Sequence, residues 1–477
     1  MDGLGCGEVY FSHVTEDNET LRLDAEFFAP KYIRTEEMLK GKHCFYLDAD
    51  NIVSGPFGST LRSSAYLERG DIPFVRIQNI IGGFKISMSD IVYISKQDND
   101  RIKNSEMHLN DLILSKVGNS IGYFARVDDR VNCCNISENN IGIKLGTFET
   151  AKKHYILTFL NCKYARELVL RRRSGNGQPK LNVGDISHIP IPRFSNPFYK
   201  SISEVIEFYD ARMEMIKEIY RSAELELERA IGLDRYKVSE DSCTRKSFMA
   251  SFAATGRLDA EYYQPKYECY EQLLRTNETV GSACKLYDNN FVPNPNNSYR
   301  YIEIANIGLA GEISAVDTLA GGELPTRARR QVRAGQVIIS SIEGSLPSCA
   351  LVTEEYDGCL CSTGFYVVDS EKMNAETLLI LFKSRPIQEL MRQRCSGTIL
   401  TNISKEVFLS MPLPVIRDEI QKRIAYKVQE VVALRRKSEQ MLDCAVRAVE
   451  MAIEHDEKTA QRWLSTVVTM ERAAESI

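Results

Sequence analysis

Loops rich in arginine, lysine, asparagine and glutamine follow several short apolar runs in this 477-residue sequence. Arginine and lysine can grip phosphate or read guanine, and asparagine and glutamine can pair with adenine through two hydrogen bonds. In the first half, the candidate DNA-contact residues are Ser59, Arg76, Gln78, Asn79, Lys116, Asn119, Arg172, Arg173, Asn176, Gln178 and Lys180. In the second half they are Arg300, Asn306, Ser341, Glu343, Arg392, Arg394, Thr398, Thr401 and Asn402. Taken singly, such residues are usually ordinary surface positions, so the prediction depends on the whole set.

Catalytic motifs are much scarcer than polar loops. Asn196-Pro197-Phe198-Tyr199 is close to the Asn-Pro-Pro-Tyr tetrapeptide with which adenine methyltransferases hold a flipped base. Asn is also a good helix cap and Pro suits the first helical turn, and no Gly-rich loop for a methyl donor precedes the tetrapeptide. The sequence contains no nucleophile elbow and no phosphate-binding loop. We therefore expect a binding protein without catalytic residues and without a cofactor.

The composition is that of an ordinary globular protein, with 43% hydrophobic and 26% charged residues. Thirteen cysteines and six histidines lack the spacing of a metal site, so we expect reduced thiols, no disulfide and no zinc. No apolar run approaches the roughly 20 residues that span a bilayer, which predicts a cytoplasmic protein. The net charge of −5 argues against indiscriminate binding to nucleic acid.

The sequence repeats itself. RLDAEFFAPKY (22–32) and RLDAEYYQPKY (257–267) differ at three positions, and two of these keep an aromatic ring. Three further pairs of segments follow in the same order: IQNI (77–80) with IANI (304–307), DLILSKVGNS (111–120) with QVIISSIEGS (336–345), and SHIPIP (187–192) with LSMPLP (409–414). An ordered series of this kind indicates a duplicated module.

Each copy begins with strand-like runs and ends with a long helical pattern. In the first copy we expect strands near Val53, Phe74–Ile77, Ile91–Ile94, Leu112–Leu114 and Ile141–Leu145, then a helix near 151–171. After each proline-bounded element, apolar residues recur in steps of three and four, the pattern of a coiled-coil seam. A helix of about 33 residues is roughly 50 Å long, longer than a small domain is wide. We expect the two helices to pair antiparallel.

These patterns predict an α+β protein with two tandem strand-rich α/β domains and two long helices. The expected boundaries are 1–195 for the first domain, 196–235 for the central helix, 236–414 for the second domain and 415–477 for the C-terminal helix. Because the loops of the two domains differ, each domain should recognise a different target.

The motifs SGNGQPKLNVGDISHIPIP and CSGTILTNISKEVFLSMPLP, each running into a long helix, resemble the specificity subunit of type I restriction-modification systems. The resemblance covers nearly the whole chain. It implies two target-recognition domains held apart on antiparallel helices, each reading one half of a bipartite, asymmetric site in double-stranded DNA. It also implies two methyltransferase subunits and motor-nuclease subunits as partners, with methyl donor, ATP and magnesium bound by those partners. The family's Pro-x-x-Glu-Gln-type helix start is approximated only after Pro414, and not after Pro192.

Two alternatives stay open. A scaffold or recognition subunit of another defence complex would also use two heads on a rod, and a self-sufficient modification enzyme would use Asn196–Tyr199.

The RLDAE segments suggest a structural role, because they are nearly identical where the recognition loops differ. We expect them to pack the entry of each head onto the end of the helical spacer.

Overall fold

The computed structural model describes residues 10, 14, 22–88, 90–118, 120–175, 179–239, 241, 243–314, 316–397 and 401–475. The chain divides into two compact units, Met1–Arg212 with Lys437–Ile477, and Met213–Arg436. Each unit contains one strand-rich head and parts of two long helices, so the fold belongs to the α+β class, as predicted. Among the described residues, no helix combines the length and the hydropathy needed to cross a bilayer.

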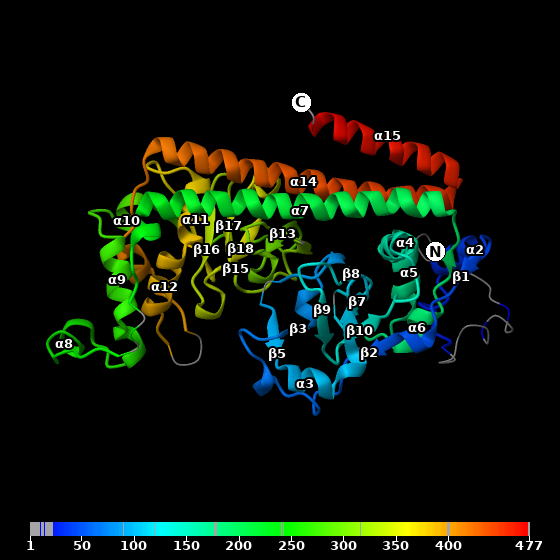
Figure 1. The fold of residues 1–477 in the computed structure, drawn as a ribbon, viewed down its shortest axis with the longest axis horizontal. Helices are drawn as coiled ribbons and strands as arrows, with labels where there is room; N and C mark the ends of the chain where they lie inside the picture. The colour runs from blue at the N-terminus through cyan, green and yellow to red at the C-terminus, as the bar shows by residue number, and fades with distance from the viewer. Residues whose placement is uncertain are drawn as a thin grey trace. The chain divides into compact units, whose positions relative to one another are not determined.

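Two sheets build the head of the first unit (Figure 1). The strands are β1 (Cys44–Phe45), β2 (Ile52–Ser54), β3 (Ile72–Val75), β4 (Phe84–Lys85), β5 (Val92–Ile94), β6 (Glu106–His108), β7 (Leu112–Ser115), β8 (Phe124–Arg126), β9 (Cys133–Ile136), β10 (Asn140–Ile143) and β11 (Ile191–Pro192). One sheet has the order β2-β10-β7-β8-β4 and the other β5-β3-β9-β6, while β1 pairs with β11. Strand β7 shows why they stack: Leu112 and Leu114 enter the helix-covered core, and Ile113 enters the core shared with the second sheet.

The head of the second unit repeats this topology. Its strands are β12 (Lys285–Tyr287), β13 (Ser298–Ile302), β14 (Asp317–Ala320), β15 (Ala328–Gln331), β16 (Val337–Ser340), β17 (Cys349–Leu351), β18 (Leu360–Ser362) and β19 (Phe365–Asp369). The sheet orders are β12-β19-β16-β17 and β14-β13-β18-β15. In both heads the second sheet contains one parallel pair, β3 with β9 and β13 with β18. Each of the eight strands of the second head thus matches one strand of the first, as a duplication would produce, while β1, β4 and β11 of the first head are additional.

Each unit also contains several short helices. The first head has α2 (Pro30–Lys40), α3 (Lys96–Arg101), α4 (Thr150–Leu160), α5 (Lys163–Arg172) and α6 (Val183–Ser187), and the second unit has α8 (Phe252–Thr255), α9 (Pro265–Leu273), α10 (Val280–Ala283), α11 (Ala375–Lys383), α12 (Arg385–Arg394) and α13 (Lys405–Ser410). The helix expected near 151–171 is therefore two helices. The break lies at Asn161, whose amide is bound to the backbone of β8: it accepts from Phe124 N at 3.1 Å and donates to Phe124 O at 2.9 Å.

The long helices are α7 (Asn196–Ile231) and α14 (Asp418–Glu454). In the first unit, Ile202 near the start of α7 shares a core with Val449 near the end of α14. In the second unit, Leu227 near the end of α7 shares a core with Ile424 near the start of α14. Lys427 donates to Ser222 Oγ there at 2.8 Å. Within each unit the paired parts of the two helices thus run in opposite directions.

The C-terminal segment, expected as one long helix, contains a second helix, α15 (Glu457–Glu475), after α14. Asp456 starts it, because its carboxylate accepts from Thr459 N at 2.9 Å. Helix α15 packs back on the first unit through its buried Ala460 and Leu464. Its Glu471 accepts a charge-assisted bond of 2.8 Å from the buried Arg212 of α7.

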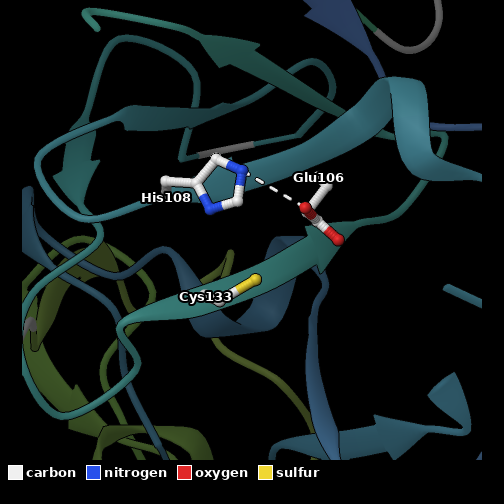
Figure 2. Close-up of side chains that lie close together, drawn as sticks. All are labelled: Glu106, His108 and Cys133. Atoms are coloured by element: carbon white, nitrogen blue, oxygen red, sulfur yellow. Dashed lines mark ion pairs between the residues drawn. The ribbon is translucent and has the colours of Figure 1, made fainter. Parts of the chain in front are cut away.

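The outer strand pair of the first head has two different faces. Strands β6 and β9 pair antiparallel, with Met107 opposite Cys134 and His108 opposite Cys133. Met107 and Cys134 are fully buried in the core between the sheets. The alternation of side chains along a strand therefore places Glu106, His108 and Cys133 together on the other face, as Figure 2 shows.

Candidate nucleic-acid interface

The repeated RLDAE segment closes the end of a helix in each head. In the first unit, Arg22 forms an ion pair with Asp24 at 2.7 Å and donates to the carbonyl oxygens of Arg171 (3.2 Å) and Arg173 (2.6 Å) at the end of α5. The last carbonyls of a helix have no partner within the helix and carry its negative partial charge, so a guanidinium there is stabilising. The hydrogen bond from Arg22 holds the pKa of Asp24 below its usual value.

The second unit uses the same contacts. Arg257 pairs with Asp259 at 2.7 Å and donates to the carbonyl oxygens of Gln393 (3.4 Å) and Cys395 (3.0 Å) at the end of α12. The aromatic pairs also match, because Phe27 with Phe28 and Tyr262 with Tyr263 both lie edge to face with ring centroids 5.0 Å apart. The RLDAE segments thus contact the ends of α5 and α12 in their own heads, whereas the sequence suggested the end of the spacer.

A short closed loop follows that helix in each head. Ser174 and Lys180 exchange two backbone hydrogen bonds of 2.8 Å, and Ser396 and Asn402 exchange bonds of 2.9 and 3.1 Å. The last residue of each closed loop also forms an isolated β-bridge with a residue shortly after the central strand, β7 or β16. Lys180 pairs with Val117, and Asn402 pairs with Ile342. The tips of the two loops, with the predicted contact residues Asn176, Gln178 and Thr398, lie outside the described residues, as does Asn119.

The first head has a cleft of about 680 Å³ against this loop. It brings together the predicted residues Lys116 and Lys180, and adds Arg101, Asn104 and Asn139, which the sequence did not single out. Its one carboxylate, Glu138, accepts a hydrogen bond from Gly58 N at 2.6 Å. The cleft is therefore lined by three cations and one acid. Arg101 was missed because it lies at the end of the short helix α3 and not in a loop after a strand.

A smaller cleft of about 250 Å³ adjoins the first and shares Glu138 and Asn139 with it. Arg76 and Gln78 line this cleft, as the sequence predicted for contact residues. Gln78 is exposed, and Ser59 is exposed on the neighbouring loop, although it does not line either cleft. Four of the predicted residues of the first head, Arg76, Gln78, Lys116 and Lys180, thus line one connected region.

Other predicted contact residues are engaged inside the heads. Asn79 is fully buried, and its amide accepts from Arg76 N and donates to Ser87 O, both at 3.0 Å. Asn306 holds the equivalent turn, accepting from Glu303 N at 2.6 Å. Both asparagines therefore cap turns. The full burial of Asn79 argues against its predicted role as a base reader, and for the partly buried Asn306 that role stays a prediction.

Several predicted arginines and one serine are also used within their heads. Arg172 is buried, Arg173 pairs with Glu26 at 2.7 Å, and Arg394 pairs with Glu271 at 2.6 Å. Arg300 donates to the backbone carbonyl of Glu355 at 2.7 Å, and Ser341 donates to that of Gly364 at 2.9 Å. Sequence clustering could not separate these structural cations from exposed ones such as Lys180, because burial is decided by packing.

The second head has a cleft of about 430 Å³ on its closed loop. The predicted residues Glu343, Arg392 and Thr401 line it, and exposed Asn402 lies at the base of the loop. The RLDAE segment contributes Arg257, Asp259, Glu261 and Tyr262, which were expected to be structural only. Two cations and three carboxylates line this cleft, the opposite balance to the first head.

The two aromatic residues of the tetrapeptide Asn196–Tyr199 lie in the core of the first unit, while Asn196 and Pro197 are exposed. Asn196 begins α7, Phe198 is fully buried, and the Tyr199 ring lies 4.7 Å from that of Tyr155. The Tyr199 hydroxyl accepts from Phe194 N at 3.0 Å. Both aromatic rings of the tetrapeptide therefore serve packing, which matches the helix-start interpretation of its sequence.

Comparison with known proteins gives matches of low similarity. No protein-family model and no curated protein matches the sequence. Among solved structures, the S subunit of a type I restriction-modification system from M. genitalium is 12% identical, with 86% of this chain and 95% of that chain covered and a TM-score of 0.32. The HsdS subunit from Thermoanaerobacter tengcongensis is 13% identical, with 87% and 97% covered and a TM-score of 0.28.

A third match comes from a structural study of complex assembly and conformational transition of the type I R-M system. It is 15% identical, with 81% of this chain and 92% of that chain covered and a TM-score of 0.25. All three matches cover most of the chain. Each TM-score lies well below 0.5, however, so the function of this chain must be supported by its own residues.

Proposed function

We propose that this chain is a sequence-specific DNA-recognition subunit of a type I restriction-modification complex. The observation that carries the proposal is that two heads of one topology present different side chains beside the same closed loop. A scaffold that is repeated while its exposed loops differ suits two recognition events of the same kind with different targets. Each head would read one half of a bipartite, asymmetric site.

The cleft of the first head has the chemistry for this task. Lys116, Lys180 and Arg101 supply cations for phosphate, and Gln78 and Asn139 supply amides for base edges. Two backbone hydrogen bonds close the base of the loop, so the residues there are held in place before any target binds. Preformed contacts of this kind reduce the ordering cost of binding.

The remaining machinery would belong to partner subunits. Two methyltransferase subunits would dock on the long helices and motor-nuclease subunits would join the complex, so that methyl donor, ATP and magnesium are bound outside this chain. The buried rings of Asn196–Tyr199 support a non-catalytic chain, because a base-holding tetrapeptide must expose its aromatic residue to the flipped base.

Replacing a closed loop tests the proposal. The chain is co-expressed with its methyltransferase partners, residues 175–179 are replaced by a Gly-Ser linker, and methylated adenines are mapped across the host genome. One half of the methylated motif should relax while the other half stays unchanged. The matched replacement of residues 397–401 should relax the other half. A replacement that changes both halves, or neither, would contradict the assignment of one half-site to each head.

A second candidate is a two-headed recognition scaffold of another defence complex. The three carboxylates in the cleft of the second head and the net charge of −5 favour it, since both oppose phosphate binding. Its signature would be a complex that assembles on the chain in pull-down experiments, with no adenine methylation that depends on the chain.

A further inference from the structure

Three side chains with metal-binding atoms meet on the outer face of the β6–β9 pair. Glu106 and His108 are two residues apart on β6 and so point to the same side. Cys133 is directly opposite His108 in the antiparallel register. Since this pair lies at the edge of its sheet, nothing in the strand order places another strand beyond β6. The three positions are thus fixed by backbone pairing and not by a flexible loop.

The donor atoms are close enough to share one ion. The carboxylate, imidazole and thiol donors all lie within 4.8 Å of one another, and Nε2 of His108 lies 3.2 Å from Oε1 of Glu106 (Figure 2). Around a tetrahedral ion with bonds of about 2.0 to 2.3 Å, ligand atoms lie roughly 3.3 to 3.8 Å apart. Small rotations of the three side chains therefore bring their donor atoms to the spacing of a tetrahedral site. The His108 side chain is 64% exposed and that of Glu106 14%, so the site is open on the imidazole side.

A second layer of contacts already holds two of the donors. The buried Asn99 donates to Oε2 of Glu106, which leaves Oε1 facing His108. Asp111 accepts from the backbone N of His108 at 2.9 Å and fixes the end of the strand. Metal-binding carboxylates are usually oriented by such outer partners, whereas a casual surface ion pair has no need of them.

We propose that Glu106, His108 and Cys133 bind one Zn²⁺ ion, with a water molecule in the fourth position. Thiolate, imidazole and carboxylate together favour zinc over magnesium or calcium, which prefer oxygen ligands only. Burial and the neighbouring Glu106 raise the pKa of the Cys133 thiol, so the metal-free thiol is protonated at neutral pH. Zinc binding forms the Zn–S bond, and the thiol proton leaves to solvent.

The ion would fasten the edge strand of the first head to its neighbour. Such a clamp has no counterpart at the matching place in the second head, where β15 and β18 pair Ala328 with Ser362 and Arg330 with Cys361. Within the described ranges, Glu106, His108 and Cys133 form the one cluster of its kind. The proposal therefore predicts metal stabilisation confined to the first head.

Cobalt substitution on the full-length chain tests the proposal. Metal-free protein titrated with Co²⁺ should bind one ion per chain and show the thiolate-to-cobalt charge-transfer band, and Zn²⁺ should displace it. Cys133→Ser should abolish the band. His108→Ala, which removes an exposed side chain, should weaken binding more than about 100-fold, beyond the cost of losing an outer-shell partner. Cys243→Ser, at an exposed cysteine of the second unit, is the matched control and should bind like the unchanged protein.

Thermal unfolding gives a second readout that does not depend on colour. Zn²⁺ should raise the Tm of the original chain and of Cys243→Ser. It should not alter the Tm of His108→Ala. Hydrogen exchange should locate the added protection in β6 and β9. Binding below one equivalent in the unchanged chain, or binding by His108→Ala and Cys133→Ser as tight as that of the unchanged chain, would overturn the proposal.

Discussion

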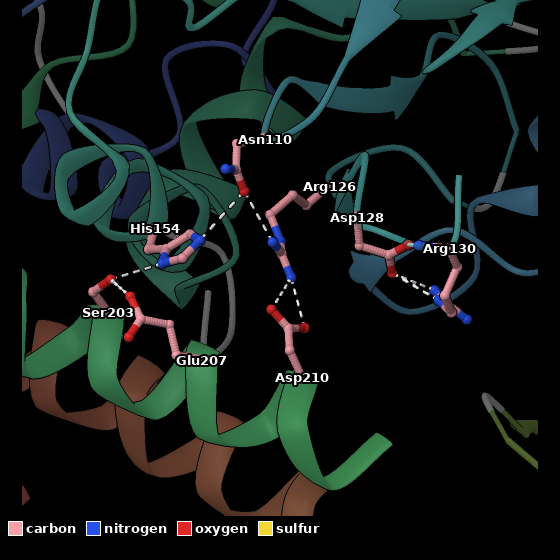
Figure 3. Close-up of polar contacts among 8 residues, drawn as sticks. All are labelled: Asn110, Arg126, Asp128, Arg130, His154, Ser203, Glu207 and Asp210. Atoms are coloured by element: carbon pink, nitrogen blue, oxygen red, sulfur yellow. Dashed lines mark hydrogen bonds and ion pairs between the residues drawn. The ribbon is translucent and has the colours of Figure 1, made fainter. Parts of the chain in front are cut away.

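The two heads are fixed to their long helices by different combinations of polar contacts. In the first unit the contact is ionic: Arg126 of β8 forms bonds of 2.7 and 2.6 Å with both carboxylate oxygens of Asp210 of α7 (Figure 3). The second unit also has an ion pair, between Arg435 of α14 and Glu312 of its head, and it adds a contact between amide groups. Gln421 of α14 accepts from Asn374 N at 2.8 Å, and the Asn374 side chain donates to Gln421 O at 3.1 Å.

A histidine completes the ionic contact of the first unit. Buried His154 of α4 lies 2.9 Å from Ser203 Oγ of α7 and 3.3 Å from Asn110 Oδ1, and Asn110 also accepts from Arg126 at 2.9 Å (Figure 3). Burial, together with the smaller effects of the Arg126 and Lys153 charges, lowers the pKa of His154 to about 3. Burial raises the pKa of Asp210, against the pull of Arg126. The histidine contact of the first unit is thus titratable, whereas the amide contact of the second unit has no proton to exchange.

The difference teaches that duplication kept the head topology while the head–helix contacts diverged. Charged contacts and amide contacts can hold the same architecture because each pairs buried donors with acceptors. They respond differently to mutation and pH, however, so the two units can be separated experimentally. Hydrogen exchange reports on each unit through its own central strand, β7 in the first and β16 in the second.

The largest effect is expected from Asp210→Ala. Removing the carboxylate leaves the buried Arg126 guanidinium without its ionic partner, which should lower the free energy of unfolding of the first unit by about 3 kcal/mol. Hydrogen exchange of β7 and denaturant unfolding measure the loss, and β16 should keep its protection. Asp234→Ala, at an exposed carboxylate, is the control and should stay within about 0.5 kcal/mol. Equal loss of protection in both units would contradict separate attachment.

The second-largest effect is expected from acid, which should lower the free energy of unfolding of the first unit. The folded-state pKa of His154 is depressed from 6.5 to about 3, so the unfolded chain binds the extra proton between these values. Its contribution to stability is complete above pH 6.5 and is lost as pH falls, by about 2 kcal/mol at pH 5. Unfolding free energy measured from pH 7.5 to 5 checks this. His154→Gln should flatten the profile of the first unit, and an unchanged slope in that variant would refute the assignment.

A smaller loss should follow from Gln421→Ala in the second unit. The variant removes the side-chain acceptor of Asn374 N and the donor to Lys372 O, at a cost of about 1 to 2 kcal/mol. Because amides do not titrate, the loss should be the same at pH 7.5 and pH 5. Exchange protection of β16 at both pH values measures it. A loss that grows with acid would contradict a contact made by amides alone at this position.

Lys180→Ala should have the smallest effect on stability. Lys180 is exposed, and its pairing with Ser174 uses backbone atoms only, so the change should stay within about 0.5 kcal/mol. DNA binding by the assembled complex should weaken, and the slope of log affinity against log salt should fall by about 1 if Lys180 meets one phosphate. Lys217→Ala, at an exposed lysine of α7, should leave the slope unchanged. A slope unaffected by Lys180→Ala would remove this residue from the interface.

The repeat, the α+β class and the helical seam could be predicted from the sequence because they depend on local patterns. DLILS alternates between two cores, as strand β7 does, and the steps of three and four mark residues of α7 that are buried. The sheet order could not be predicted, since strands β3 and β9 pair across about 60 intervening residues. Long-range pairing leaves no mark in the pattern of a single strand.

The candidate site was predictable in outline and not in detail. Lys116 and Lys180 were found because both follow apolar runs, and the structure places them in one cleft. Asn79 resembled them in sequence but is used by its own turn, a fact that depends on where its amide points. Glu106, His108 and Cys133 showed no ligand spacing because their approach is set by strand register.

Mapping adenine methylation with and without this chain tests the central claim most directly. In cells that contain its methyltransferase partners, the chain should direct methylation to one bipartite motif with two different halves at a fixed separation. Deleting the chain should remove that methylation completely, and restoring it should return the same motif. Two results would contradict two-headed DNA recognition: the same methylated adenines in cells with and without the chain, or a continuous motif in place of a bipartite one.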